Sequence, residues 1–140
     1  MKYWNTRVHF IAAAILTLNS TFAEAAGEQE YVAGEQEYIV ACAVCHGESA
    51  MGDGPFTDLL NISTPGLLEL TRANDGVFPF EAVLATIDGR DGVRAHGSQM
   101  PIWGERFQAS ATSQRGETAE MVARGRVLSL VYYLRSIQQE

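Results

Sequence analysis

Lysine, cysteine and long apolar runs are all scarce in this sequence. Its 140 residues include a single lysine, Lys2, and two cysteines, Cys42 and Cys45. The formal net charge of −7 at pH 7 would repel nucleic acid and anionic membrane surfaces, so neither is an expected partner. No convincing strand pattern is present, and the chain length suits one compact domain. We therefore predict an all-α fold.

An apolar run near the beginning of the chain has the features of an export signal. It extends from Val8 to Leu18, about eleven residues, whereas a helix that spans a bilayer needs about 20. Lys2 and Arg7 give a positive start, and small residues around Ala25 suit a cleavage site. We predict a signal peptide over residues 1–25 and a periplasmic protein without stable membrane insertion after cleavage, with an uncleaved anchor as the alternative. Cleavage removes two basic residues and one acidic residue, so the formal net charge changes from −7 to −8.

The next segment is a near-perfect tandem repeat, with AGEQEYV at residues 26–32 and AGEQEYI at residues 33–39. A seven-residue period is typical of a helix with one apolar stripe, but two copies are too few for a coiled coil. We predict that the second copy is helical and continues into the cysteines. Residues 26–33 are predicted to be a flexible extension, so that one domain covers residues 34–140.

Further helices are predicted where apolar residues recur with helical spacing and glycines stop them. The pattern indicates a short helix within residues 65–74, a second over residues 80–87 and a last one over residues 117–138. Glycine-rich composition predicts irregular structure over residues 47–65 and 88–104. The buried stripe of the last helix is predicted to be Val127, Leu130, Val131, Leu134 and Ile137.

The strongest motif in the chain is C-x-x-C-H, at residues 42–46. Two thiols three positions apart at a helix end can each form a thioether with one vinyl group of a haem, and the histidine that follows is brought under the iron. Because Cys42 and Cys45 are the only cysteines, neither is required for pairing elsewhere. The motif predicts one haem c, covalently bound through both cysteines, with its iron bound by His46.

Other sites also use a C-x-x-C pair, and each fits the rest of the chain less well. A thioredoxin-like redox pair belongs near a βαβ pattern, and no strands are expected here. A zinc site needs three or four ligands, and beyond residues 42–46 only His96 remains after signal cleavage. A disulfide across two intervening residues is geometrically tight and closes a loop too short to stabilise the fold much.

A second axial ligand is expected on the opposite face of the iron, because haem iron used for electron transfer is usually six-coordinate. Met100 is the first candidate. It follows His46 by 54 residues, lies in a glycine-rich loop, and is held out of helical conformation by Pro101. His96 is the alternative, since two histidines also make a sound ligand pair. We predict that His46 and Met100 bind the iron, and His96 stays open as the substitute.

Four segments in this order resemble a small bacterial class I c-type cytochrome. They are CAVCHG at residues 42–47, Gly52-Asp53-Gly54-Pro55, Met100-Pro101-Ile102-Trp103-Gly104 and Leu130-Val131-Tyr132-Tyr133-Leu134. The resemblance extends from about Gly34 to Ile137 and implies helices wrapped around one haem. It also implies that the Pro55 carbonyl accepts a hydrogen bond from the proximal histidine. Trp103 is predicted either to pack against the haem or to fill the core around it. Gly34 and Tyr38 would then lie where the first helix crosses the last, although Gly34 also belongs to the local repeat.

These features together predict a single-electron carrier rather than an enzyme. Its expected partners are a donor and an acceptor protein for electrons, and the chain itself is expected to be a monomer. An acidic surface suits partners with basic docking patches, although charge alone also serves solubility. The alternative is a haem-binding subunit of a periplasmic oxidoreductase, or a haem enzyme or sensor whose iron keeps an open position.

Overall fold

The computed structural model describes residues 31–60, 63–90, 100–111 and 118–139. Within these ranges all regular structure is helical, which confirms the predicted all-α class. Residues 31–41 are helical, and the later elements are α2 (Ala43–His46), α3 (Pro55–Leu60), the 3-10 helix η1 (Arg72–Asn74), α4 (Phe80–Asp88), α5 (Trp103–Ser110) and α6 (Ala119–Ser136). No helix in this part of the chain is both long and apolar enough to cross a membrane.

Several predictions fall wholly or partly outside these ranges. The predicted signal peptide, residues 26–30 of the predicted extension and the alternative ligand His96 all lie outside the described residues. Residues 31–33, the end of that extension, are helical and continuous with the second copy of the repeat. The described helix therefore begins before the predicted domain boundary at residue 34.

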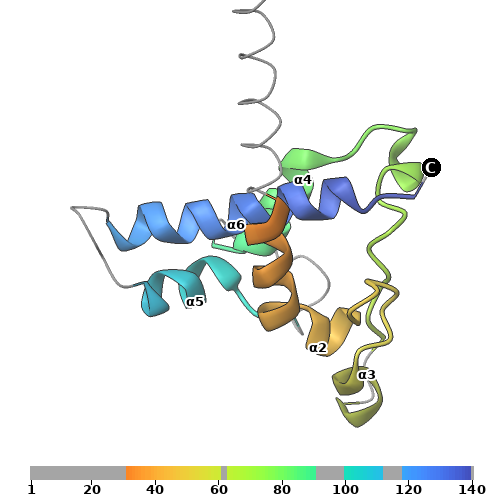
Figure 1. Cartoon of the computed structure of the whole chain (residues 1–140), viewed down its shortest axis with the longest axis horizontal. Coiled ribbons are helices and arrows are strands. Elements are labelled where there is room, and N and C mark those ends of the chain that lie inside the picture. The colour runs from red at the N-terminus through yellow and green to blue at the C-terminus, as the bar shows by residue number, and fades with distance from the viewer. Residues whose placement is uncertain (1–30, 61–62, 91–99, 112–117, 140) are drawn as a thin grey trace, which may run out of the picture.

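Helices α4 and α5 both pack against α6 (Figure 1). Its apolar stripe is buried as predicted, with Val127, Leu130, Val131 and Leu134 between 0% and 4% exposed and Ile137 packed against the same core. The Thr118 hydroxyl caps the helix by accepting a hydrogen bond from the Met121 backbone N–H at 3.2 Å. Burial of this stripe, more than helix propensity, holds the helix in place.

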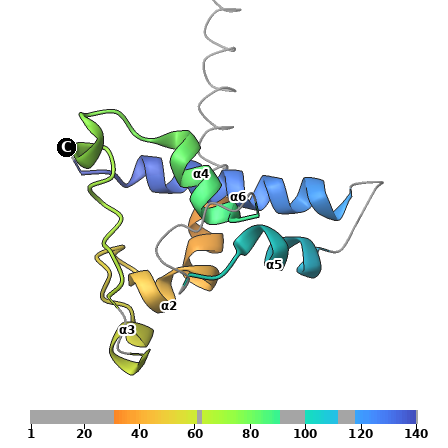
Figure 2. The same cartoon turned by 180° about the vertical axis from the view of Figure 1, so that it is seen from behind.

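The helix over residues 31–41 crosses α6 at very short range (Figure 2). A Cβ placed on Gly34 would lie 2.7 Å from Tyr133 Cβ and would overlap the Ser129 carbonyl oxygen, so only glycine fits. Tyr38 is fully buried beside it, and its ring centroid lies 5.3 Å from that of Tyr133. The crossing expected for Gly34 and Tyr38 is confirmed. Gly34 therefore has a packing role beyond its place in the repeat.

Helix α4 also agrees with its sequence pattern. It extends from Phe80 to Asp88, one residue beyond the predicted end, with Val83 and Ile87 buried. Gly89 follows it in the left-handed conformation, with φ of 69°, and its N–H donates to the Ala85 carbonyl. This is the glycine stop that the sequence indicated.

Two helices lie wholly or partly in segments that were predicted to be irregular. α3 lies within the glycine-rich stretch 47–65, and α5 begins at Trp103, inside the stretch 88–104, and continues to Ser110. α5 is stabilised by tertiary contacts, because Phe107 is only 2% exposed and its ring lies 5.4 Å from that of Trp103. The short helix expected within residues 65–74 is limited to turns and the single 3-10 turn η1.

Candidate functional site

A cavity of about 320 Å³ lies beside α2 and brings together distant parts of the chain. One wall comes from residues 41–46, a second from residues 63–65, and a third from residues 100–106. The surface that lines it is mainly apolar. Its volume is within the range of about 300–1,000 Å³ that is usual for cofactor and ligand sites. Cys42, Cys45, His46, Met100 and Trp103 all line it, so these five predicted site residues share one cavity.

The cysteines reach the cavity because the first helix ends at them. The Cys42 backbone N–H still donates to the Tyr38 carbonyl at 2.8 Å, and His46 N–H donates to the Cys42 carbonyl at 2.9 Å. Cys42, Cys45 and His46 are thus held on one tight turn, α2, with Gly47 as its C-cap at φ of 80°. Both cysteines carry free thiols, of which Cys42 is buried and Cys45 half-buried.

The His46 ring is buried and oriented by a backbone carbonyl. Its Nδ1 lies 3.0 Å from the Pro65 carbonyl oxygen, and the side chain is 7% exposed. A carbonyl oxygen can only accept, so Nδ1 carries the proton in this hydrogen bond. This tautomer makes Nε2 the nitrogen suited to bind a metal, and the hydrogen bond raises its basicity.

The prediction that the Pro55 carbonyl accepts this hydrogen bond is wrong, because Pro65 provides the carbonyl. Pro55 is the first residue of α3, is exposed, and is not part of the cavity wall. The loop instead folds back at Gly52 and Gly66, where a Cβ on Gly52 would lie 3.0 Å from Gly66 N. A bond from Leu67 N–H to the Ala50 carbonyl, 2.8 Å long, fixes the same close approach.

The third wall of the cavity comes from the beginning of α5. Met100 and Pro101 are half-buried, and Trp103 follows as the first residue of the helix. Arg106 lies one turn later, with its guanidinium carbon 5.5 Å from the Trp103 ring centroid. The cavity therefore offers a thioether sulfur and an indole on the side supplied by residues 100–106.

The electrostatics of Cys42 differ from those of a catalytic thiol. Burial, together with the smaller effect of the negative charges of Glu37 and Cys45, raises the pKa of the Cys42 thiol to about 12. Dithiol catalysts need a thiol with a lowered pKa, because the thiolate is the reacting species. Among the described residues, no three His, Cys, Asp or Glu side chains come together as a metal site, which is the arrangement that zinc requires.

The donor set and the cavity suit a haem. Two thiols and an imidazole lie on one turn, the thioether side chain of Met100 lines the same cavity, and the remaining lining is largely apolar. Neither family models, nor curated proteins, nor solved structures gave a match to the chain. The interpretation of the site therefore depends on its own residues and geometry.

Proposed function

We propose that this chain is a periplasmic carrier of single electrons that holds one haem c. Cys42 and Cys45 would form the two thioether bonds, and His46 and Met100 would bind the iron. The supporting observation is the shared cavity: residues 42–46 and Met100 are 54 or more positions apart in sequence and line the same apolar space. The fold proposed with it is that of a class I cytochrome c.

The chain's own residues account for what such a site needs. The Pro65 carbonyl holds the imidazole of His46 in one tautomer and one orientation. Trp103, whose ring packs against Phe107, lines one side of the cavity with apolar surface. When bound, haem c would supply an iron that is reversibly oxidised and reduced by one electron, at a potential set by its axial ligands and its burial.

A carrier of this kind transforms no substrate, so its partners are an electron donor protein and an electron acceptor protein. If His46 and Met100 both bound the iron, no coordination position would be left for oxygen or peroxide. The alternative, a haem enzyme or sensor with an open position, requires that neither Met100 nor His96 binds the iron. The identity of the second ligand is therefore the property that separates the two functions.

Replacing Met100 by alanine is expected to change the optical spectrum of the oxidised holoprotein. Methionine ligation is expected, as the resemblance to class I c-type cytochromes implies, to give a weak long-wavelength absorption band in the oxidised form. We call it the methionine–iron band, and the variant should lose it. The reduction potential should fall as well, because a methionine sulfur opposite histidine raises it. Absorption spectra of both redox states and a potentiometric titration measure these effects.

The matched control is Met121→Ala, because Met121 is 61% exposed on α6 and does not line the cavity. This variant should keep the band and the potential of the wild type. If Met100→Ala leaves both unchanged, Met100 is not the ligand, and either another side chain such as His96 binds the iron or the position is open.

A further inference from the structure

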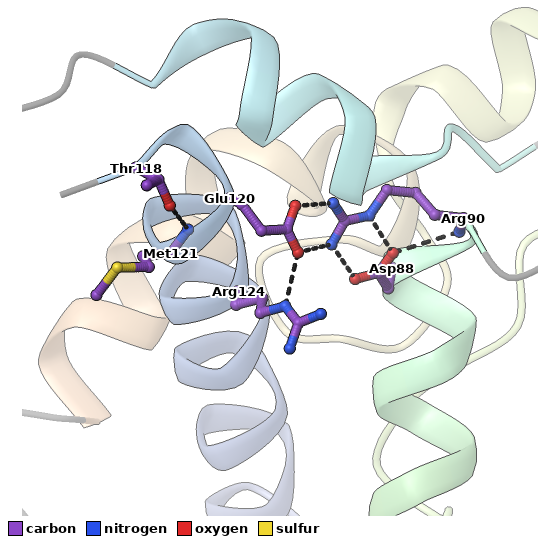
Figure 3. A network of polar contacts seen from close by, with 6 residues as sticks. All are labelled: Asp88, Arg90, Thr118, Glu120, Met121 and Arg124. Carbon is purple, nitrogen blue, oxygen red and sulfur yellow. Dashed lines mark hydrogen bonds and ion pairs between the residues drawn. The ribbon is translucent and has the colours of Figure 1, made fainter.

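A network of ion pairs joins the end of α4 to the beginning of α6 (Figure 3). The Arg90 guanidinium donates to both carboxylate oxygens of Asp88, from Nε at 2.6 Å and from Nη2 at 2.7 Å. It also donates to both oxygens of Glu120, from Nη1 and, at 3.3 Å, from Nη2. Two bidentate pairs on one guanidinium fix its plane as well as its charge.

This network is partly shielded from solvent. The side chains of Arg90 and Asp88 are each 20% exposed, and that of Glu120 is 37% exposed. Hydrogen bonds to Arg90 lower the pKa of both carboxyl groups, so all three side chains are charged at neutral pH. Arg124 also donates to Glu120, at 2.6 Å, but its side chain is 75% exposed. Exposed ion pairs contribute little to the stability of a fold, and partly buried bidentate pairs contribute more.

The network also contacts the segment that supplies Met100. A Cβ on Gly104 would lie 2.9 Å from Asp88 Cγ and nearer still to Arg90 Nε, so the backbone at the beginning of α5 rests directly on this ion pair. Gly89, which lies between Asp88 and Arg90 and directly follows α4, packs against Ile102, with its Cβ position 3.5 Å from the Ile102 Cα. Residues 88–90 and 102–104 are therefore in close contact, two residues beyond Met100.

We propose that Asp88, Arg90 and Glu120 form a positioning network that holds Met100 at the cavity. Glu120, on α6, accepts hydrogen bonds from Arg90, and Arg90 and Asp88 pack directly against Gly104. These contacts hold the beginning of α5 against the rest of the fold. Met100 lies four residues before Gly104, and the direction of its sulfur depends on the local backbone. This inference rests on the proposed function, because it assigns the network to the ligand that the carrier needs.

The sharpest comparison is between Arg90→Gln and Arg124→Gln. Both remove one positive charge and one partner of Glu120, but only Arg90 contacts residues at the beginning of α5. The oxidised holoprotein is titrated with denaturant while the methionine–iron band and the helical circular dichroism are followed together. In Arg90→Gln the band should disappear at a lower denaturant concentration than the helical signal. Before the helices unfold, the fraction of molecules that have lost the methionine ligand should be about tenfold or more above that of the wild type at the same denaturant concentration.

In the wild type and in Arg124→Gln the two signals should be lost together. Arg90→Lys keeps the charge but cannot bind two carboxylates in bidentate fashion, so an intermediate separation of the signals is expected. It also serves as the test if Arg90→Gln does not fold.

Coincident loss of both signals in Arg90→Gln and Arg90→Lys, as in the wild type, would overturn the positioning role and leave the proposed function intact. A wild-type holoprotein that lacks the band, or a Met100→Ala variant that keeps it, would instead overturn the ligand assignment and this inference with it. The two failures are thus distinguished by the spectra of the wild type and of Met100→Ala.

Discussion

A chain in which Cys42 and Cys45 are both replaced by alanine is expected to carry no covalently bound haem. These are the only two cysteines, and both line the cavity, so no other thiol can form a thioether. After expression in a host that attaches haem to c-type cytochromes, the wild type should keep its colour through denaturing electrophoresis. The double variant should lose all of it, and any haem still present should be extractable with acidified organic solvent.

The single variants are the controls for this result. Cys42→Ala and Cys45→Ala each keep one thiol, so each should retain haem through one bond, at reduced yield. His46→Ala keeps both thiols but removes the nitrogen that the Pro65 carbonyl orients. Covalent colour that persists in the double variant would contradict the attachment site, since it would require another linkage.

The second large effect is expected at the crossing of the first helix and α6. Gly34→Ala should lower the free energy of unfolding by about 2 kcal/mol, because the new methyl group overlaps the Ser129 carbonyl oxygen and the two helices must separate. For a domain of this size, this corresponds to a fall of roughly 10 °C in Tm. Thermal unfolding of the holoprotein, followed by circular dichroism, measures the change.

Gly125→Ala is the matched control, because Gly125 is also a helical glycine but has nothing within 4 Å of its Cβ position. This substitution should stabilise the protein by about 0.5–1 kcal/mol, as alanine does on the exposed face of a helix. The two variants should therefore shift Tm in opposite directions. A stabilising effect of Gly34→Ala would mean that the helices do not approach each other as closely as described.

The sequence was most informative where burial and local pattern agree. The apolar stripe of α6 and the glycine after α4 could be located from spacing alone, since a long amphipathic helix and a glycine stop are both local signals. Gly34 was ambiguous, because the same residue belongs to a repeat and to a helix crossing. Only the position of Ser129 against it shows which constraint applies.

Helix α5 shows where local signals are too weak. Trp103 and Phe107 are one helical turn apart and are the only two large apolar residues of α5. The segment before them is rich in glycine, which hides the helical pattern. The helical state of α5 depends on packing: Phe107 is buried, and the Arg126 guanidinium carbon on α6 lies 4.0 Å from its ring centroid. Contacts of this kind join residues distant in sequence and leave no periodic trace in either segment.

Which proline carbonyl accepts the hydrogen bond from His46, that of Pro55 or that of Pro65, also depends on contacts between residues distant in sequence. Both prolines follow the histidine within a loop, and the sequence alone does not show which carbonyl returns to the ring. The path that brings the Pro65 carbonyl to the histidine ring is set by Gly52 and Gly66, because their backbones pass so close that Gly52 has no room for a side chain. The cysteines, the histidine and Met100 could be selected in advance because their chemistry, rather than their contacts, identifies them.

The central claim is that a haem is bonded through sulfur to Cys42 and Cys45, and intact-mass measurement tests it most directly. The protein is produced in a host that attaches haem to C-x-x-C-H motifs and is denatured before analysis. The account predicts a polypeptide heavier than its sequence mass by one haem, with the added mass on a peptide that contains residues 42–46. A mass equal to that of the bare polypeptide would contradict the account.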